Sequence, residues 1–173
     1  MKRVQAELLA CERVLGMKGV RAVVLGRALK GVEVAANAWL ARLAGAGLQL
    51  KLRAYTEKKT GGISDSISLE VEGAGGGLGY RAASGGERRR IDVALLFALA
   101  DVAAASFGRE PGTLFVDECF DALDVEGVDA VSAALGELAQ ERTVVVVTHS
   151  ADLAARLPAA MRLVVEGGRV QVA

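Results

Sequence analysis

Two short apolar runs, each ending in polar residues, constrain most strongly how this chain can fold. Residues 113–116 lead into Asp117-Glu118, and residues 143–147 lead into a segment that contains His149. Short runs rich in β-branched residues are typical of buried strands, and helical patterns precede and separate them. Strands that alternate with helices predict an α/β fold with a parallel sheet covered by helices on both faces. The carboxyl ends of such strands share one edge, so these polar residues are expected there.

The rest of the chain shows further periodic segments. Apolar spacing predicts helices over about 32–43, 85–106 and 127–140, and alternation predicts strands at 48–54 and 67–71. A final hairpin is expected at residues 162–165 and 169–172, around two glycines. Near the N-terminus, Val4, Leu8, Cys11 and Leu15 are spaced as in a coiled-coil seam or one amphipathic helix, and two heptads do not distinguish these.

Composition excludes several classes of protein. The 173 residues are 52% hydrophobic with a mean hydropathy of +0.33, which predicts one folded domain. The longest apolar stretch is interrupted by Asp101, so no membrane span is expected, and the N-terminus lacks a secretory core. A cytoplasmic location is therefore expected. Cys11 and Cys119 form no CxxC pair, which argues against a disulfide framework or a zinc site.

Charge is balanced overall but unevenly distributed. Residues 1–60 hold 12 basic and 4 acidic residues, and residues 61–173 hold 9 and 17, so the two parts carry net charges of +8 and −8. Such asymmetry is typical of a polyanion-facing part joined to a part with another task. Solvated helix faces explain it equally well.

The sequence Ala83-Ser84-Gly85-Gly86-Glu87 opens the longest expected helix. Ser84 and Glu87 have the spacing of a capping box, which is sufficient to explain the motif structurally. Two glycines also let backbone N–H groups at a helix N-terminus approach an anion closely. A cap and a phosphate cradle are compatible, so both interpretations stay open.

Asp117, Glu118 and His149 have the chemistry of a nucleotide-hydrolysing site. Asp117 can orient Mg²⁺ through water and Glu118 can polarise an attacking water, although a strand often ends in an acidic loop. His149 is the only histidine, and it follows Asp117 by one helix and one strand, which predicts that it lies beside Asp117 on the neighbouring strand. The glycine-rich residues 73–79 precede Tyr80-Arg81, and no GKS or GKT occurs in these 173 residues, so this loop is expected to be a hinge or spacer.

Taken in order, four motifs resemble the signature motif, Walker B, D-loop and H-loop of ABC-type ATPases. They are Ser84-Gly85-Gly86-Glu87, Phe115-Val116-Asp117-Glu118, Ala122-Leu123-Asp124 and Thr148-His149-Ser150. The segment from Ser84 to Leu95 looks like the SbcC and SMC branch, and His149 favours SbcC-like repair ATPases over SMC condensins and the RecF type. The resemblance covers residues 80–173, and more loosely 16–21 and 35–40. Ala83 stands where leucine is usual, and Cys119 stands where proline is frequent.

The resemblance implies an ABC-type P-loop NTPase head of which this chain is the C-terminal lobe. Residues 1–16 would be the end of a coiled coil and residues 17–173 the lobe. Because the motifs present do not include Walker A, the lobe would need an N-terminal Walker A lobe for activity. It would also expose an apolar surface or sheet edge when isolated.

In this family, two heads enclose two ATP molecules, so ATP and Mg²⁺ are the implied cofactors. The signature residues Ser84, Gly85, Gly86 and Glu87 would belong to the site that contacts the γ-phosphate held by the opposite head. Asp117 would support Mg²⁺ and Glu118 would act as general base. His149 would contact the γ-phosphate, and Asp124 would cross the dimer interface.

The implied partners are a second head, a nuclease subunit of the SbcD type and double-stranded DNA, in a bacterial or phage-encoded system without a membrane. Basic residues available for DNA are Lys2, Arg3, Arg13, Lys18, Arg21, Lys51, Arg53, Lys58 and Lys59. The alternatives are an SMC- or RecF-like chromosome maintenance ATPase, an ABC transporter nucleotide-binding fragment, a non-catalytic interaction module, and an unrelated α/β protein.

Overall fold

The computed structural model describes residues 4–5, 11–12, 14–16, 19–57, 63–73, 79–108, 112–120, 123–159 and 161–172. Its helices are α2 (Val20–Ala44), α3 (Gly85–Ser106), α4 (Val125–Glu141) and α5 (Ala151–Arg156), with single 3₁₀ turns η1 (Gly45–Gly47) and η2 (Tyr80–Ala82). Its strands are β1 (Gln49–Glu57), β2 (Ile63–Glu72), β3 (Leu114–Asp117), β4 (Val144–Val147), β5 (Leu163–Glu166) and β6 (Arg169–Val172). Every element expected from residue 32 onward is present. Of the seam residues expected near the N-terminus, Val4, Cys11 and Leu15 lie in short helical stretches, and Leu8 lies outside the described residues.

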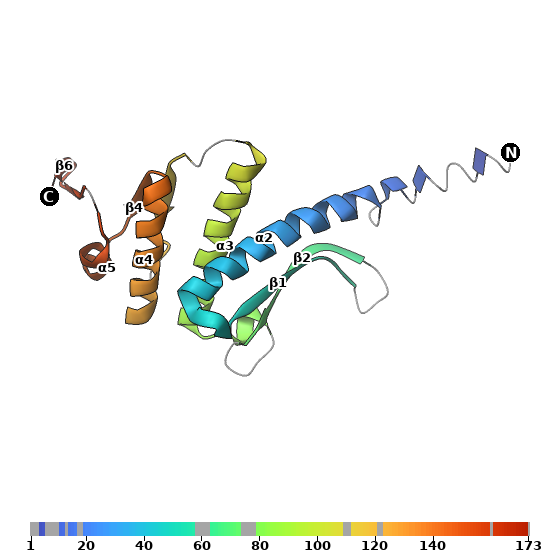
Figure 1. Ribbon diagram of the computed structural model, residues 1–173, viewed down its shortest axis with the longest axis horizontal. Coiled ribbons are helices and arrows are strands. Elements are labelled where there is room, and N and C mark those ends of the chain that lie inside the picture. The colour runs from blue at the N-terminus through green and yellow to red at the C-terminus, as the bar shows by residue number, and fades with distance from the viewer. Residues whose placement is uncertain are drawn as a thin grey trace.

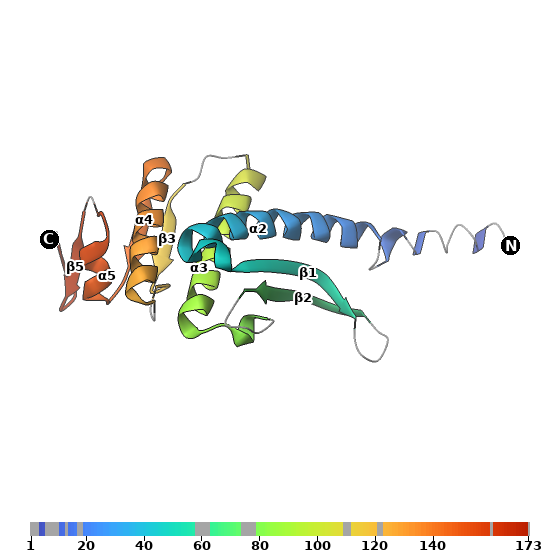
Figure 2. The same cartoon turned by 60° about the horizontal axis from the view of Figure 1, so that its bottom comes forward.

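Helix α2 is longer than expected because it begins at Val20, not near residue 32. Its C-terminal half packs in the core, whereas its N-terminal half leaves the body of the molecule (Figures 1 and 2). Val20, Val23 and Val24 on this half are 53%, 55% and 61% exposed. Val20, Val23 and Val24 already have helical spacing, but nearly all buried residues of α2 lie from Val32 onward, in the part that the expected helix covers.

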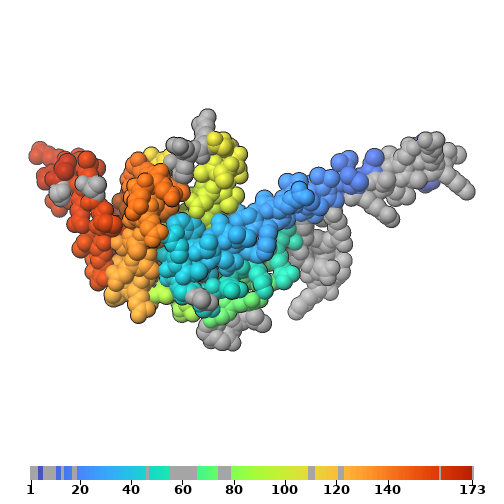
Figure 3. Space-filling model, in the orientation of Figure 1, coloured from blue at the N-terminus to red at the C-terminus, as the bar shows by residue number. Residues whose placement is uncertain are grey.

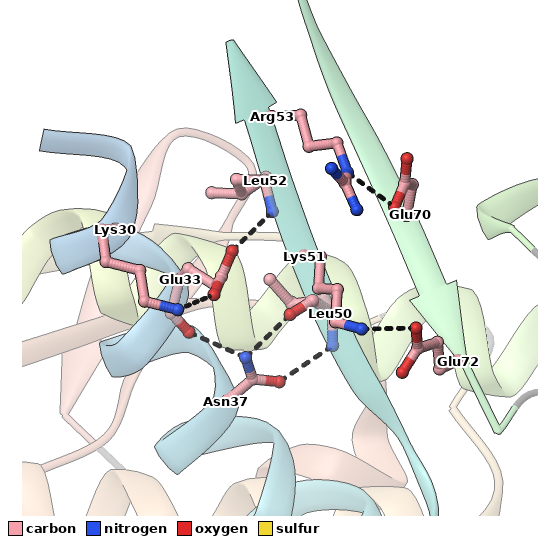
Figure 4. A network of polar contacts seen from close by, with 9 residues as sticks. All are labelled: Lys30, Glu33, Asn37, Leu50, Lys51, Leu52, Arg53, Glu70 and Glu72. Carbon is pink, nitrogen blue, oxygen red and sulfur yellow. Dashed lines mark hydrogen bonds and ion pairs between the residues drawn. The ribbon is translucent and has the colours of Figure 1, made fainter. Parts of the chain in front are cut away.

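Strands β1 and β2 form an antiparallel hairpin that runs beside α2 (Figure 2). Polar side chains of α2 cover the outer edge of β1 (Figure 4). The Asn37 amide accepts a hydrogen bond from the Leu50 N–H and donates one to the Leu50 carbonyl, both at 2.8 Å, and Glu33 Oε2 accepts from the Leu52 N–H at 2.9 Å. Asn37 and Glu33 thus replace a neighbouring strand at an edge that would otherwise be open.

The core lies where α2 packs against α3 and α4. Leu40, Ile91 and Val131, one from each helix, are fully buried. The Trp39 and Phe97 rings meet edge to face with centroids 5.0 Å apart. The Trp39 indole also donates to Asp101 Oδ2 at 2.7 Å, so the polar tip of this buried ring has a partner.

Strands β3 and β4 are parallel, as expected, with Asp117 opposite Val147. Val116 is buried, but Phe115 and Val147 are 71% and 52% exposed. Helices thus cover one face of this pair, and not both faces as expected for a complete parallel sheet. The open apolar face agrees with the surface expected for a single lobe. β5 and β6 form a separate exposed hairpin (Figure 1; the space-filling view of Figure 3 shows the same end of the molecule).

The structure offers no membrane-spanning candidate within the part of the chain that it describes. No helix there combines sufficient length with sufficient apolar character to cross a bilayer.

Candidate functional site

Ser84 begins α3 with the capping box expected from its spacing to Glu87. The Glu87 N–H donates to Ser84 Oγ at 3.2 Å, and the Ser84 N–H donates to Glu87 Oε2 at 2.7 Å. Ser84 and Gly85 remain exposed, while Gly86 is partly buried. The helix therefore presents a capped but open N-terminus, at which the macrodipole favours an anion.

Glu118 follows β3 in an uncommon backbone conformation. Its φ of +46° is the only positive value among the described non-glycine residues. For a residue with a side chain this conformation costs on the order of 1–3 kcal/mol, and such strain is concentrated at functional sites. The Glu118 N–H still donates to the Val147 carbonyl at 2.9 Å, so the parallel pairing extends one residue past the strand before the chain turns.

The turn brings Glu118 to His149. Glu118 Oε1 lies 2.9 Å from His149 Nδ1, although the two residues are 31 positions apart. Both side chains are more than half exposed, so the pair is open to solvent. His149 therefore lies at the carboxyl end of β3, as expected, but its contact is with Glu118 and not with Asp117. The Asp117 carboxylate, also exposed, has no hydrogen-bond or ion-pair partner among the described residues.

Two arginines of α3 that the sequence pattern does not single out contact the segment between β3 and α4. Arg89 Nη2 donates to the Glu118 carbonyl at 3.0 Å, and Arg90 forms an ion pair with Asp124. The signal in the sequence is the run Glu87-Arg88-Arg89-Arg90, within the segment that resembles the SbcC and SMC branch. Nothing in its spacing indicates which of the three arginines turns toward the segment between β3 and α4.

Asp124 caps α4, because its carboxylate accepts from the Gly127 N–H at 2.9 Å. The hydrogen bond from Arg90, followed by that from Gly127, holds the pKa of Asp124 below its usual range. A Cβ on Gly127 would lie 2.7 Å from Asp124 Oδ1 and 3.2 Å from Arg90 Nε, so a side chain there would force the Asp124 carboxylate to move from its present contacts. In this structure the side chain of Asp124 binds its own chain, whereas the resemblance implies that it crosses a dimer interface.

The donor set limits which metal this site can hold. Within the described ranges, no group of three or more histidine, cysteine, aspartate or glutamate residues is placed to bind a metal ion. One exposed carboxylate, Asp117, is consistent with Mg²⁺, which keeps several waters and takes its remaining ligands from substrate phosphates. The residues present therefore fit Mg²⁺ delivered with a nucleotide, and they do not fit a resident transition metal.

Solved structures define the class of fold. One chain from a study of ATP-driven dimerization and DNA-stimulated activation of SMC ATPases matches with a TM-score of 0.66 at 21% identity, over 88% of each chain. An SMC head crystallised with the C-terminal winged-helix domain of ScpA matches with a TM-score of 0.61 at 24% identity, over 87% of this chain and 44% of the other. The fold is that of an SMC-type ATPase head, an ABC-type P-loop fold.

Sequence comparison relates the chain to a narrower group. It is 39% identical to the SbcC component of the nuclease SbcCD of Rhodobacter capsulatus over 106 residues, which are 59% of this chain and 8% of the relative. It is 41% identical to exonuclease subunit 2 of Escherichia phage RB69 over 71 residues, 40% of this chain and 12% of the relative. The phosphate import ATP-binding protein PstB of Mycobacterium leprae is 33% identical over 93 residues, 54% of this chain and 30% of the relative.

These alignments cover only part of each relative, which limits the properties of the relatives that can be inferred for this chain. It spans between about a twelfth and a third of the curated relatives described above. No model of a protein family matches it. The resemblance to SbcC- and SMC-like ATPase heads is nevertheless supported by both the sequence relatives and the fold.

Proposed function

We propose that this chain is the C-terminal lobe of an SbcC-like ATPase that hydrolyses ATP between two heads and couples hydrolysis to DNA end processing. The observation that carries the proposal is the 2.9 Å contact between Glu118 and His149 at the carboxyl ends of two parallel strands. A carboxylate supported by an imidazole, beside a free Asp117, is suited to holding a water against a phosphate. The exposed N-terminus of α3 supplies a separate anion site.

The proposed roles are those that the resemblance implies, and the positions of the residues are compatible with them. Ser84, Gly85 and Gly86 bind the γ-phosphate of a nucleotide held by the opposite head, through a hydroxyl and first-turn N–H groups. Asp117 supports Mg²⁺, which when bound neutralises charge on the phosphates. Glu118 polarises the attacking water. His149 contacts the γ-phosphate and holds the Glu118 carboxylate in place.

The phosphate-binding loop is proposed to come from a Walker A lobe. The lobe covers the open face of β3 and β4, where Phe115, Val145 and Val147 are exposed. Burial of these three side chains would provide the apolar contact that the isolated pair lacks. Without this lobe, we expect negligible ATPase activity.

Helix α2 favours an SbcC- or SMC-like head over a transporter subunit. Its N-terminal half leaves the body of the molecule and exposes Val20, Val23 and Val24 (Figure 2). A protruding helix with apolar residues on its surface is suited to pairing with a second helix in a coiled coil. The PstB relatives make a transporter ATPase the second candidate, and association with a membrane permease instead of a nuclease would favour it.

DNA and a nuclease subunit are proposed partners. Lys51 and Arg53 each form a cross-strand ion pair with a glutamate, which reduces the charge that they offer to phosphates (Figure 4). Arg21 and Arg27 are exposed along α2 and are better placed for DNA. Lys2, Arg3, Arg13, Lys18, Lys58 and Lys59 lie outside the described residues. Replacing Arg21 and Arg27 with glutamine should weaken DNA binding and its salt dependence more than replacing Lys51 and Arg53.

The test is ATP turnover of the head assembled with its Walker A lobe, with and without linear DNA. Glu118→Gln should lower kcat by about 10²-fold or more, because the amide cannot accept a proton, while ATP still joins the heads into a dimer. An ATPase rate unchanged by Glu118→Gln would exclude the proposed role. Activity of this chain alone would show that its phosphate-binding site is not supplied by another lobe.

A further inference from the structure

Arg89 connects the proposed signature helix to the residue proposed to activate water. It lies in the second turn of α3, and its Nη2 donates to the backbone carbonyl of Glu118 at 3.0 Å. The Glu118 N–H is held on its other side by the Val147 carbonyl at 2.9 Å. The peptide groups on both sides of the Glu118 Cα are therefore fixed, one by the neighbouring strand and one by α3.

These two hydrogen bonds hold Glu118 in a strained backbone conformation. Glu118 has a φ of +46°, and a residue with a side chain keeps such a conformation only where its surroundings determine it. If the turn relaxed to an ordinary negative φ, the Cα–Cβ bond would point in another direction. The 2.9 Å contact between Glu118 and His149 depends on that direction. The hydrogen bond from Arg89 thus acts on the carboxylate through the backbone.

The placement of Arg89 is specific. Its Nε is buried and has no hydrogen-bond partner among the described residues, so the guanidinium gives up solvation to reach the carbonyl. The neighbouring Arg90 turns to Asp124 instead. Two consecutive residues of α3 therefore hold the two ends of the segment between β3 and α4, and of these two arginines it is Arg89 that contacts Glu118.

We propose that Arg89 is a positioning residue, which fixes the Glu118 turn to the signature helix and keeps the Glu118 carboxylate beside His149. This inference rests on the proposed function and adds a residue that touches neither nucleotide nor metal. Ser84 lies five residues earlier on the same helix. A displacement of the helix N-terminus by a phosphate at Ser84 would therefore move the Glu118 turn through Arg89.

The test uses the head assembled with its Walker A lobe and measures kcat and KM for ATP separately. Arg89→Leu should lower kcat at least tenfold and leave KM within twofold, because Arg89 does not contact ATP. Arg89→Lys should recover part of the loss, since its ammonium can donate to the same carbonyl. ATP-dependent dimerisation should be unchanged, because Ser84, Gly85 and Gly86 are intact.

A double-mutant cycle with Glu118→Gln distinguishes positioning from general damage. If Arg89 acts through the Glu118 carboxylate, Arg89→Leu should cause little further loss in a Glu118→Gln head. An equal loss in both backgrounds, or a change in KM with kcat preserved, would overturn the proposal. Unchanged kcat in Arg89→Leu would overturn it while leaving the proposed function standing, whereas unchanged kcat in Glu118→Gln alone would remove the proposed function itself.

Arg142 provides the matched control for stability. Its guanidinium is also buried, donates to Asp101 Oδ1 at 2.8 Å, and has an Nε without a partner among the described residues, but it lies away from Glu118. Arg142→Leu should lower the Tm about as much as Arg89→Leu does, but it should keep kcat within twofold of the wild-type value. If Arg89→Leu does not fold, Arg89→Met, whose side chain is long but donates no hydrogen bond, replaces it with the same expected loss of kcat, and normal kcat in that variant contradicts the proposal.

Discussion

Arg90 and Asp124, 34 residues apart, form an ion pair at the point where α4 begins. The same carboxylate accepts the Gly127 N–H at 2.9 Å, so it caps α4 and binds α3 simultaneously. The beginning of α4 is thereby fixed to α3, the helix that Ser84 caps. The Asp124 cap is a local contact within three residues of sequence, and Arg90 is the partner that only the fold provides.

The Asp124 contacts predict a pH-dependent stability. Because Arg90 lowers its pKa in the folded state, Asp124 contributes stability above the ordinary aspartate pKa of about 3.9 and loses it as the pH falls through the lowered value. Asp124→Asn keeps a capping oxygen but loses the charge, so it should be less stable than wild type at pH 7. Urea unfolding at several pH values should show this difference closing below about pH 4. A difference independent of pH would contradict the role of the ion pair.

Gly127 should not tolerate a side chain. Gly127→Ala places a Cβ 2.7 Å from Asp124 Oδ1, and we expect a loss of about 1–3 kcal/mol in the free energy of unfolding. Gly31→Ala is the matched control, because this exposed position inside α2 has nothing within 4 Å of a new Cβ. It should stabilise the protein by about 0.5–1 kcal/mol. Equal effects of the two substitutions would show that the beginning of α4 is not tightly packed.

Ser84 can be tested for capping and for phosphate binding separately. Ser84→Ala should lower the free energy of unfolding by about 1 kcal/mol, because it removes the acceptor for the Glu87 N–H. Ser84→Asp keeps a strong N-cap but adds negative charge where a phosphate is proposed to bind. It should retain the Tm yet abolish ATP-dependent dimerisation with the Walker A lobe present. Normal dimerisation of Ser84→Asp would leave Ser84 with a capping role only.

Asn37 should matter more for stability than the ion pairs on the same hairpin. Asn37→Leu leaves the N–H and carbonyl of Leu50 without partners at the edge of β1, which we expect to cost about 2 kcal/mol or more. Arg53→Ala removes an exposed ion pair with Glu70 and should cost less than about 1 kcal/mol. Denaturant unfolding of both variants measures the difference. A larger effect for Arg53→Ala would contradict this account of the edge.

The order of elements and the Ser84 cap were predictable because they depend on neighbours in sequence. Strand alternation, helical periodicity and the three-residue spacing from Ser84 to Glu87 are local signals. The proximity of His149 to the end of β3 was also predictable, because parallel strands joined by a helix place their carboxyl ends together. The site roles of Asp117, Glu118 and His149 stay predictions, since they concern a nucleotide and a second head.

The sequence by itself determined the elements, the helix cap and the edge at which the acidic residues and His149 meet, because short-range periodicity encodes these. Only the tertiary structure decided that His149 contacts Glu118, that Arg89 and Arg90 turn to opposite ends of the segment between β3 and α4, and that Glu118 has a positive φ. Consecutive arginines on a helix have the same chemistry and differ by about 100° in direction. Their partners are therefore set by the packing of α3 against the rest of the chain, which no local pattern contains.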